Sequence, residues 1–333
     1  MSHAERIESK RQELGSRLAV LAHHYQQDEV VRHADIVGDS LELARKIPLL
    51  DAEYIVMCGV YFMAESASIL AKEEQNVYIP DREAGCTLSE LAPGGLLEMA
   101  LQGLQREGRK VIPLAYVNTS ASVKALCGRY GGTVCTSANA ATMLDWSLKQ
   151  SDAVLFLPDK NLAHNVADQL GIPESRRSTF SQAGNDEDTR LYIWPGLCDV
   201  HLAFRPEQIE AIRKRSDSAK VIVHPECPPE VVRLADASGS TSSIISYVHQ
   251  ADPGSEIYVG TEINLVNRLA ERYAGQKDVR PLEASSCVHM ARINAAKLCS
   301  LLESMESAEP VAVGAKDRSW ALIALERMLE VCS

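Results

Sequence analysis

The sequence repeats one order of elements three times, and this repeat restricts the possible folds more than any other feature. Each unit begins with a short apolar run that predicts a buried strand and that ends abruptly in polar residues. A helix-like segment, a turn of small residues and an apolar-periodic helical segment then follow in the same order. The three initial runs are residues 18–22, 111–115 and 221–223, so the sequence predicts three related units.

Two further strands complete each unit, and helical segments separate them. Strands that alternate with helices at this spacing predict parallel sheets covered on both faces, with ligands at the carboxyl ends of the strands. The units begin about 90 and 110 residues apart, which is the size of a compact domain. We therefore expect an α/β fold of three small doubly wound domains whose strand ends face a common centre. The further strands are predicted at residues 54–58, 153–157 and 256–259, and at 77–79, 191–193 and 279–281.

Breaks in the periodic pattern indicate the domain limits. Pro93 and two glycines interrupt the pattern after the first unit, and Pro206 interrupts it after the second. The polar segment 173–190 is expected to be a surface excursion of the second unit, and helices are expected at 291–305 and 319–331. The predicted domains are residues 1–92 with an N-terminal helix, 93–205 and 206–290, followed by C-terminal helices over 291–333 that pack back on the domains.

Length, charge and composition disfavour several classes of protein. The 333 residues exceed one ordinary core, and no apolar run approaches the roughly 18 residues of a membrane-spanning helix, so no membrane partner is expected. The charged amino terminus lacks the apolar core of a secretory signal, which favours a cytoplasmic location. A net charge of −11 argues against nucleic acid as a partner. Nine cysteines in a reducing compartment favour thiols or metal ligands over disulfides.

Three cysteines close the three units and are the candidate metal ligands. Cys86, Cys198 and Cys287 each follow small residues, which let the backbone approach a bulky group. A site with three protein ligands, either one zinc ion or an iron-sulfur cube, keeps one position open for a substrate oxygen. The sequence contains no Cys-x-x-Cys motif, which disfavours zinc-ribbon and redox-dithiol sites. Of the other cysteines, Cys58 and Cys299 are expected in the core, Cys127 in a helix, Cys135 and Cys227 as rival ligands, and Cys332 as incidental.

Polar side chains gather where the first strand of each unit ends. Histidine, tyrosine and glutamate occupy equivalent positions there, which favours catalysis over isolated core residues. A His-Pro-Glu turn places an imidazole beside a carboxylate, a pairing suited to moving protons to and from carbon or nitrogen. The residues are His23, His24 and Tyr25 in the first unit, Tyr116, Val117 and Asn118 in the second, and His224, Pro225 and Glu226 in the third.

The turns of small residues offer hydroxyls and free amides next to predicted helix starts. Ser40, Ser137 and Thr241 close these turns in the three units. Such hydroxyls often cap the following helix, and the amides beside them hold carboxylates or phosphates. The two roles are compatible, so the turns predict binding sites for an anionic small substrate.

Many short motifs of the sequence resemble those of one known family. They resemble motifs of the quinolinate synthase family of de novo NAD biosynthesis, and they occur in the same order as in that family. The motifs are LAHHYQ, VGDSLELAR, CGVYFMAES, PDREAGC, YVNTSASVKA, CTSANA, FLPDKNL, WPGLC, HPEC, GSTS and SSCVHM. The resemblance covers nearly all of residues 18–290. It implies three pseudo-symmetric, three-layer α/β/α domains with small parallel sheets around a central active site that holds a 4Fe-4S cluster.

The resemblance also implies a reaction and its partners. The family condenses iminoaspartate (iminosuccinate) with dihydroxyacetone phosphate to give quinolinate, phosphate and two waters, with the open iron of the cluster as a Lewis acid. Because iminoaspartate is unstable, functional coupling to an L-aspartate-oxidising enzyme is expected.

Carried over position by position, the resemblance assigns roles to individual residues. The cluster ligands correspond to Cys86, Cys198 and Cys287. Glu226 is expected as the principal base and Tyr25 as an acid, with His23, His224 and Tyr116 as further catalytic residues. The substrate-binding positions correspond to His23, Ser40, Tyr116, Val117, Asn118, Ser137, His224, Pro225, Glu226 and Thr241.

Two other classes of protein stay open. A mononuclear zinc hydrolase could use three cysteines, although catalytic zinc more often takes histidine and carboxylate ligands. A redox sensor built on a cluster would also place cysteines near turns, but it has no need of convergent histidine, tyrosine and glutamate side chains.

Overall fold

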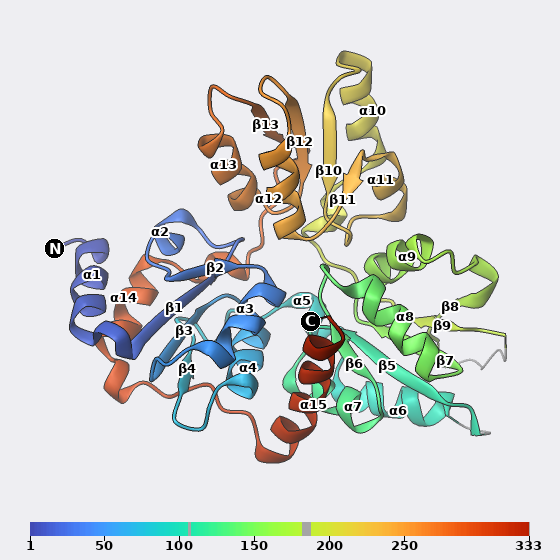
Figure 1. Ribbon diagram of the computed structural model, residues 1–333, viewed down its shortest axis with the longest axis horizontal. Helices are drawn as coiled ribbons and strands as arrows, with labels where there is room; N and C mark the ends of the chain where they lie inside the picture. Colours follow the sequence, from blue (N-terminus) through green and yellow to red (C-terminus); the bar gives the residue numbers. More distant parts are fainter. Residues whose placement is uncertain (106–107, 182–187, 333) are drawn as a thin grey trace.

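Three small parallel sheets, each flanked by helices, form the fold and surround a common centre (Figure 1). The structure is a computed structural model that describes residues 1–105, 108–181 and 188–332. The sheets have four, five and four strands, so the expected α/β fold with three α/β/α units is confirmed. Within the described ranges, no helix combines the length and the apolar composition needed to cross a membrane. The domain limits stay predictions.

The first unit has a four-stranded sheet of order β2-β1-β3-β4. Its elements are α1 (His3–Leu14), β1 (Leu18–His23), α2 (Asp28–Val31), β2 (Ile36–Gly38), α3 (Ser40–Lys46), β3 (Tyr54–Cys58), α4 (Tyr61–Leu70) and β4 (Asn76–Tyr78). Every residue of β1 and β3 is buried, as expected of central strands covered on both faces. The strands predicted at 18–22 and 54–58 are confirmed.

The second unit has a five-stranded sheet of order β6-β5-β7-β9-β8. A short helix, α5 (Thr87–Glu90), precedes the unit. Its elements are α6 (Gly94–Leu104), β5 (Val111–Tyr116), α7 (Ala121–Arg129), β6 (Thr133–Cys135), α8 (Ala140–Gln150), β7 (Ala153–Leu157), α9 (Lys160–Gln169), β8 (Arg177–Thr179) and β9 (Leu191–Ile193).

The surface excursion expected over residues 173–190 contains a strand that the sequence did not predict. Residues 177–179 form β8, which lies at the sheet edge and pairs in parallel with β9. None of these three residues is buried, so the strand lacks the apolar pattern that would reveal it in the sequence. Residues 182–187 of this excursion lie outside the described part of the chain.

The third unit has a four-stranded sheet of order β11-β10-β12-β13. Its elements are α10 (Pro206–Arg215), β10 (Lys220–Val223), α11 (Pro229–Leu234), β11 (Ala237–Ser238), α12 (Thr241–Gln250), β12 (Glu256–Gly260), α13 (Ile263–Arg272) and β13 (Asp278–Pro281). The turns of small residues therefore follow short edge strands, β2, β6 and β11. Sequence reasoning did not find these strands, because two or three residues are too few to show a periodicity.

Two C-terminal helices, α14 (Ala295–Glu303) and α15 (Ala315–Val331), lie against the first and second units (Figure 1). α14 packs on α1, and α15 packs on α7, β6 and α4. The contact with α7 depends on Gly128, because a Cβ atom there would lie 1.9 Å from the carbonyl oxygen of Trp320. A glycine at this position lets the two helix backbones touch.

Candidate active site

A single cavity lies where the carboxyl ends of β1, β5 and β10 meet, and all three units contribute to its lining. It encloses about 750 Å³ of space free of atoms, counted out to its opening to solvent, which is in the usual range of ligand sites. Twelve of the fourteen residues selected from the sequence line it. They are His23, Tyr25, Ser40, Cys86, Tyr116, Asn118, Ser137, Cys198, His224, Glu226, Thr241 and Cys287.

The structure does not bring the other two selected residues to the cavity wall. Val117 borders a small apolar pocket between α3 and α4, and Pro225 borders a groove between the second and third units. Both are neighbours of lining residues in the chain but do not themselves line the cavity.

The three cysteines share one local backbone structure. The carbonyl oxygens of Cys86, Cys198 and Cys287 accept hydrogen bonds from the amides four residues later, at 3.1, 3.1 and 3.0 Å. Each cysteine therefore opens a helical turn whose first amides have no partner within the helix. All three thiols are free and line the same cavity. The rivals Cys135 and Cys227 are fully buried and do not line it.

The environment of these thiols suits a cation. Burial raises the pKa of Cys86 to about 12, and the backbone amides of Ser89 and Leu88 oppose that shift. Burial likewise raises the pKa of Cys198 and Cys287, and an amide two or three residues later opposes it in each case. Amides directed at a sulfur stabilise a thiolate, whereas burial without a counterion disfavours it. The sulfurs are therefore arranged to lose their protons on binding a metal.

The three sulfurs do not form a compact site for a single ion. Cys86, Cys198 and Cys287 are not a set whose Sγ atoms all lie within 4.8 Å of one another. A tetrahedral zinc ion, with zinc-sulfur bonds of about 2.3 Å, needs thiolates only about 3.8 Å apart. As placed, the three cysteines therefore do not hold one zinc ion together.

A mononuclear site is offered by a different set of side chains. Ligand atoms of Cys198, His201 and Glu226 all lie within 4.8 Å of one another, and no other such set occurs in the part of the chain that the structure describes. One thiol, one imidazole and one carboxylate are ligands that catalytic zinc accepts. The zinc alternative would therefore use one of the three predicted cysteines and not all three.

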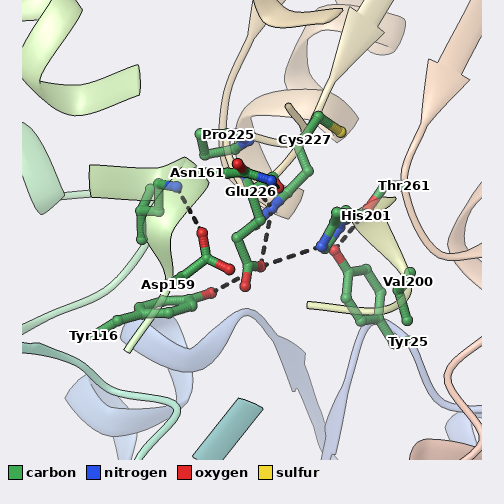
Figure 2. A network of polar contacts seen from close by, with 12 residues as sticks. Tyr25, Tyr116, Asp159, Asn161, Val200, His201, Pro225, Glu226, Cys227 and Thr261 are labelled. Carbon is green, nitrogen blue, oxygen red and sulfur yellow. Dashed lines mark hydrogen bonds and ion pairs between the residues drawn. The ribbon is translucent and has the colours of Figure 1, made fainter. Parts of the chain in front are cut away.

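Glu226 is the centre of a buried polar network (Figure 2). The Tyr116 hydroxyl donates to its Oε2 atom at 3.3 Å, and Nδ1 of His224 lies 3.2 Å from the same atom. Nδ1 of His201 approaches Oε2 to 3.4 Å, and Oε1 has no hydrogen-bond partner in the protein. Burial raises the pKa of Glu226, and the adjacent His201 opposes this shift. A carboxyl group with a raised pKa in a cavity is a candidate for proton transfer.

Burial keeps three histidines of the site neutral and its two predicted catalytic tyrosines protonated. Burial lowers the pKa of His23, His201 and His224 to about 3 in each case. Burial also raises the pKa of Tyr25 and Tyr116 well above 10. At neutral pH these groups act as polar, uncharged donors and acceptors. Only Glu226 among the predicted catalytic residues has a carboxyl group.

Three residues of the network were not found from the sequence. The Thr261 hydroxyl lies 2.6 Å from the Tyr25 hydroxyl and 3.5 Å from Nε2 of His201, so it links the first unit to the loop of Cys198. Asp159 is fully buried and caps α9 by accepting from the Leu162 amide at 2.6 Å, while its other oxygen has no partner. Thr261 directly follows β12, so a search for polar residues at the ends of middle strands would have found it.

The hydroxyls of Ser40 and Thr241 are left free for a ligand, because other residues cap α3 and α12. Asp39 caps α3, and Ser240 caps α12. Ser40, Ser137 and Thr241 line the cavity at the starts of α3, α8 and α12. No lysine or arginine occurs among the described residues of the lining. An anion there would be held by hydroxyls, amides and the positive ends of helices.

Comparison with known proteins relates the chain to one family. The family model described as quinolinate synthetase A protein matches residues 5–330. The quinolinate synthase of Halalkalibacterium halodurans is 42% identical over 340 residues, which cover 98% of this chain and 92% of that one. The quinolinate synthases of Bacillus velezensis and Acidobacterium capsulatum are 42% and 40% identical, each with the same two coverages.

Proposed function

The chain belongs to the quinolinate synthetase A family, and from this membership we propose that it condenses iminoaspartate with dihydroxyacetone phosphate in de novo NAD biosynthesis. The products are quinolinate, phosphate and two waters. The observation that carries the proposal is the meeting of three cysteines, one from each sequence repeat, with uncharged histidines, tyrosines and Glu226 at one cavity.

Cys86, Cys198 and Cys287 would hold a 4Fe-4S cluster. Their number leaves one iron without a protein ligand, and such an iron supplies a Lewis acid for a hydroxyl or carbonyl oxygen of the substrate. The free thiols, their shared cavity and the amides directed at the sulfurs support this assignment.

The hydroxyls at the helix starts would bind the anionic groups of the substrates. Ser40, Ser137 and Thr241 belong to three different units, so together they surround a small molecule from several sides. Hydroxyls and amides orient carboxylates and phosphate without bringing a full positive charge near the reacting carbons. Such local donors also offset the long-range repulsion from a protein of net charge −11.

Proton transfers would be shared between Glu226 and Tyr25. Carbon-carbon bond formation and isomerisation need protons taken from and returned to carbon, nitrogen or oxygen, and each of the two dehydrations also needs a proton given to the leaving oxygen. Glu226, whose pKa is raised by burial, is the carboxyl group placed to accept protons. Tyr25, protonated at neutral pH and hydrogen-bonded to Thr261, is suited to donate one. His224 and Tyr116 would hold the carboxylate in place.

The unstable imine would come from an L-aspartate-oxidising enzyme, and the reaction belongs in a reducing compartment such as the cytoplasm. The nine cysteines, all within the described ranges, are free thiols. An exposed cluster and free thiols both survive longest where the glutathione pool keeps thiols reduced.

Anaerobic reconstitution with iron and sulfide, followed by an assay for quinolinate, tests the proposal. Quinolinate should form only when both substrates and the reconstituted protein are present. A protein that binds zinc without sulfide and forms no quinolinate would instead favour the mononuclear site of Cys198, His201 and Glu226. A reconstituted protein with the cluster but no turnover would favour a redox sensor.

A further inference from the structure

Two turns that carry the proton-transfer residues are held by helices of a different unit. The Glu226 turn comprises residues 224–227 of the third unit, and the Tyr25 turn comprises residues 23–26 of the first. Each follows the first strand of its sheet. The contacts that hold them come from α9 and α13, the helices that follow the middle strands of the second and third sheets.

α9 holds the Glu226 turn through two buried asparagines. Nδ2 of Asn165 donates to the carbonyl oxygens of Pro225 and Cys227 at 2.8 and 2.9 Å. Nδ2 of Asn161 donates to the carbonyl oxygen of Glu226 at 3.2 Å. Asn161 and Asn165 are four residues apart and therefore share one face of the helix. Three consecutive carbonyls of the turn are thus bound by side chains of the second unit.

α13 holds the Tyr25 turn in the same way. Nδ2 of Asn264 donates to the carbonyl oxygen of Tyr25 at 3.4 Å. The guanidinium of Arg268 donates to the carbonyl oxygen of Gln26 at 2.7 Å and also to that of His24. Asn264 and Arg268 are again four residues apart on one helix face. Three consecutive carbonyls of this turn are likewise bound across a unit boundary.

The two arrangements occupy equivalent positions of the internal repeat. The N-cap residue is Asp159 in α9 and Glu262 in α13. Asn161 and Asn264 lie two positions after the cap, and Asn165 and Arg268 lie six positions after it. The first unit contacts the second in a related manner, since Glu65 of α4 accepts from the Ala121 amide at 3.0 Å. The contacts therefore run from first unit to second, second to third and third to first.

We infer that Asn161, Asn165, Asn264 and Arg268 are positioning residues that fix the Glu226 and Tyr25 turns from the neighbouring unit. Each of their hydrogen bonds to the two turns goes to a backbone carbonyl, so the helices set where each turn lies without touching the side chains that transfer protons. A buried carbonyl that loses its donor is costly, and the turn then moves toward another partner or toward water. Correct placement of Glu226 therefore depends on the docking of the third unit against α9.

Variants of Asn165 test the inference directly. Asn165→Leu removes both hydrogen bonds at nearly constant size, and Asn165→Asp replaces the donors with oxygens that repel the carbonyls. The matched control is Arg233→Met, which removes the 3.2 Å ion pair between Arg233 of α11 and Asp168 of α9. That pair joins the same two units but does not contact the Glu226 turn.

The first measurement is amide hydrogen exchange, which does not depend on any activity. Both Asn165 variants should speed exchange in peptides over residues 224–227 at least about tenfold, because the turn opens more often. Exchange over α11 should stay unchanged, as should exchange over residues 224–227 in Arg233→Met. Equal exchange in the Asn165 variants and in the control would overturn the inference.

The second measurement is turnover, and its interpretation rests on the proposed function. The Asn165 variants should lower kcat by roughly 10- to 100-fold, with KM for dihydroxyacetone phosphate and the iron content nearly unchanged. A loss of iron, or a rise in KM alone, would show a general structural defect and contradict a positioning role. If the wild-type protein makes no quinolinate, the proposed function fails while the exchange result still decides the inference.

The hydrogen bonds from α13 to the Tyr25 turn provide an independent check if the Asn165 variants fail to fold. Arg268→Lys keeps the charge but loses the fork that reaches two carbonyls. It should speed exchange over residues 23–26 and leave residues 224–227 unchanged. Unchanged exchange over residues 23–26 would contradict the inference for that turn.

Discussion

His201 and His224 stack with their ring centroids 4.4 Å apart and their planes inclined by 16°, and their Nδ1 atoms both approach Oε2 of Glu226. One ring belongs to the loop after Cys198, and the other belongs to the turn after β10. Because burial keeps both rings neutral, they enclose the carboxyl group without fixing its charge. Glu226 is therefore free to exchange a proton with a substrate.

Replacement of Glu226 by Gln should abolish most turnover without disturbing the metal site. The amide keeps the shape of the side chain but cannot accept the proton, so kcat should fall by about 10²- to 10⁴-fold. The measurement is the steady-state rate of quinolinate formation by anaerobically reconstituted protein, with iron and sulfide content as the control. Activity within a few-fold of wild type would remove Glu226 from its role as base.

Replacement of His201 by Gln should distinguish a cluster held by three cysteines from a single metal ion held by Cys198, His201 and Glu226. If Cys86, Cys198 and Cys287 hold a cluster, iron and sulfide per chain should be unchanged, while kcat falls because Glu226 loses a neighbour. If one ion is held by Cys198, His201 and Glu226, the variant should lose the metal. Metal and sulfide analysis of the purified variant distinguishes the two outcomes.

Stability should depend on pH through Lys124, which is fully buried on α7. Burial lowers the pKa of Lys124 from 10.5 to about 8. Between these values the unfolded chain binds more protons than the folded chain, so the free energy of unfolding rises with pH. Below pH 8 the buried ammonium costs about 3 kcal/mol relative to pH 11.

The matched variant for this effect is Lys124→Met, measured by urea denaturation from pH 7 to pH 10.5. The free energy of unfolding of the wild type should rise relative to that of the variant by up to about 3 kcal/mol over this range. Burial also raises the pKa of the thiols, so their titration in the unfolded chain changes stability in the same range. This contribution is nearly common to both proteins since, among the described thiols, Lys124 interacts only with those of Cys127 and Cys86. A difference that does not change with pH would contradict the lowered pKa.

Replacement of Gly128 by Ala should destabilise the protein through the contact between α7 and α15. The added Cβ atom would lie 1.9 Å from the Trp320 carbonyl oxygen, so one helix must move, at a cost of at least about 2 kcal/mol. The control is Gly95→Ala in α6, where the added atom meets no described residue within 4 Å. That variant should be neutral or up to about 1 kcal/mol more stable. Thermal unfolding of both variants checks the prediction, and equal melting temperatures would contradict it.

The sequence predicts the central strands well because strands buried on both faces consist almost entirely of apolar residues. β3 and β7 match the predicted ranges, since each is an uninterrupted apolar run. The edge strand β8 has no such run, and its three polar residues gave no signal. The repeat also indicated which strand ends carry polar residues, and these ends do meet at one cavity.

The sequence alone could not predict which residues of different units contact one another. His201 lies in a stretch without periodicity, and only the tertiary structure brings it against His224 of the third unit. Asn165 resembles any polar residue of an amphipathic helix until its partners, the carbonyls of Pro225 and Cys227, are seen. Capping by Asp39 and Ser240, and not by Ser40 and Thr241, is likewise decided by one-residue differences in the turns.

The most direct test of the account is the iron and sulfide content of four single variants after anaerobic reconstitution. Wild-type protein should contain about four iron and four sulfide atoms per chain and show the visible absorption of a cluster. Cys86→Ala, Cys198→Ala and Cys287→Ala should each lose the cluster, whereas Cys227→Ala, a buried thiol outside the cavity lining, should keep it. Unchanged iron and absorption in any of the first three variants would contradict the claim that the three repeats jointly hold one cluster.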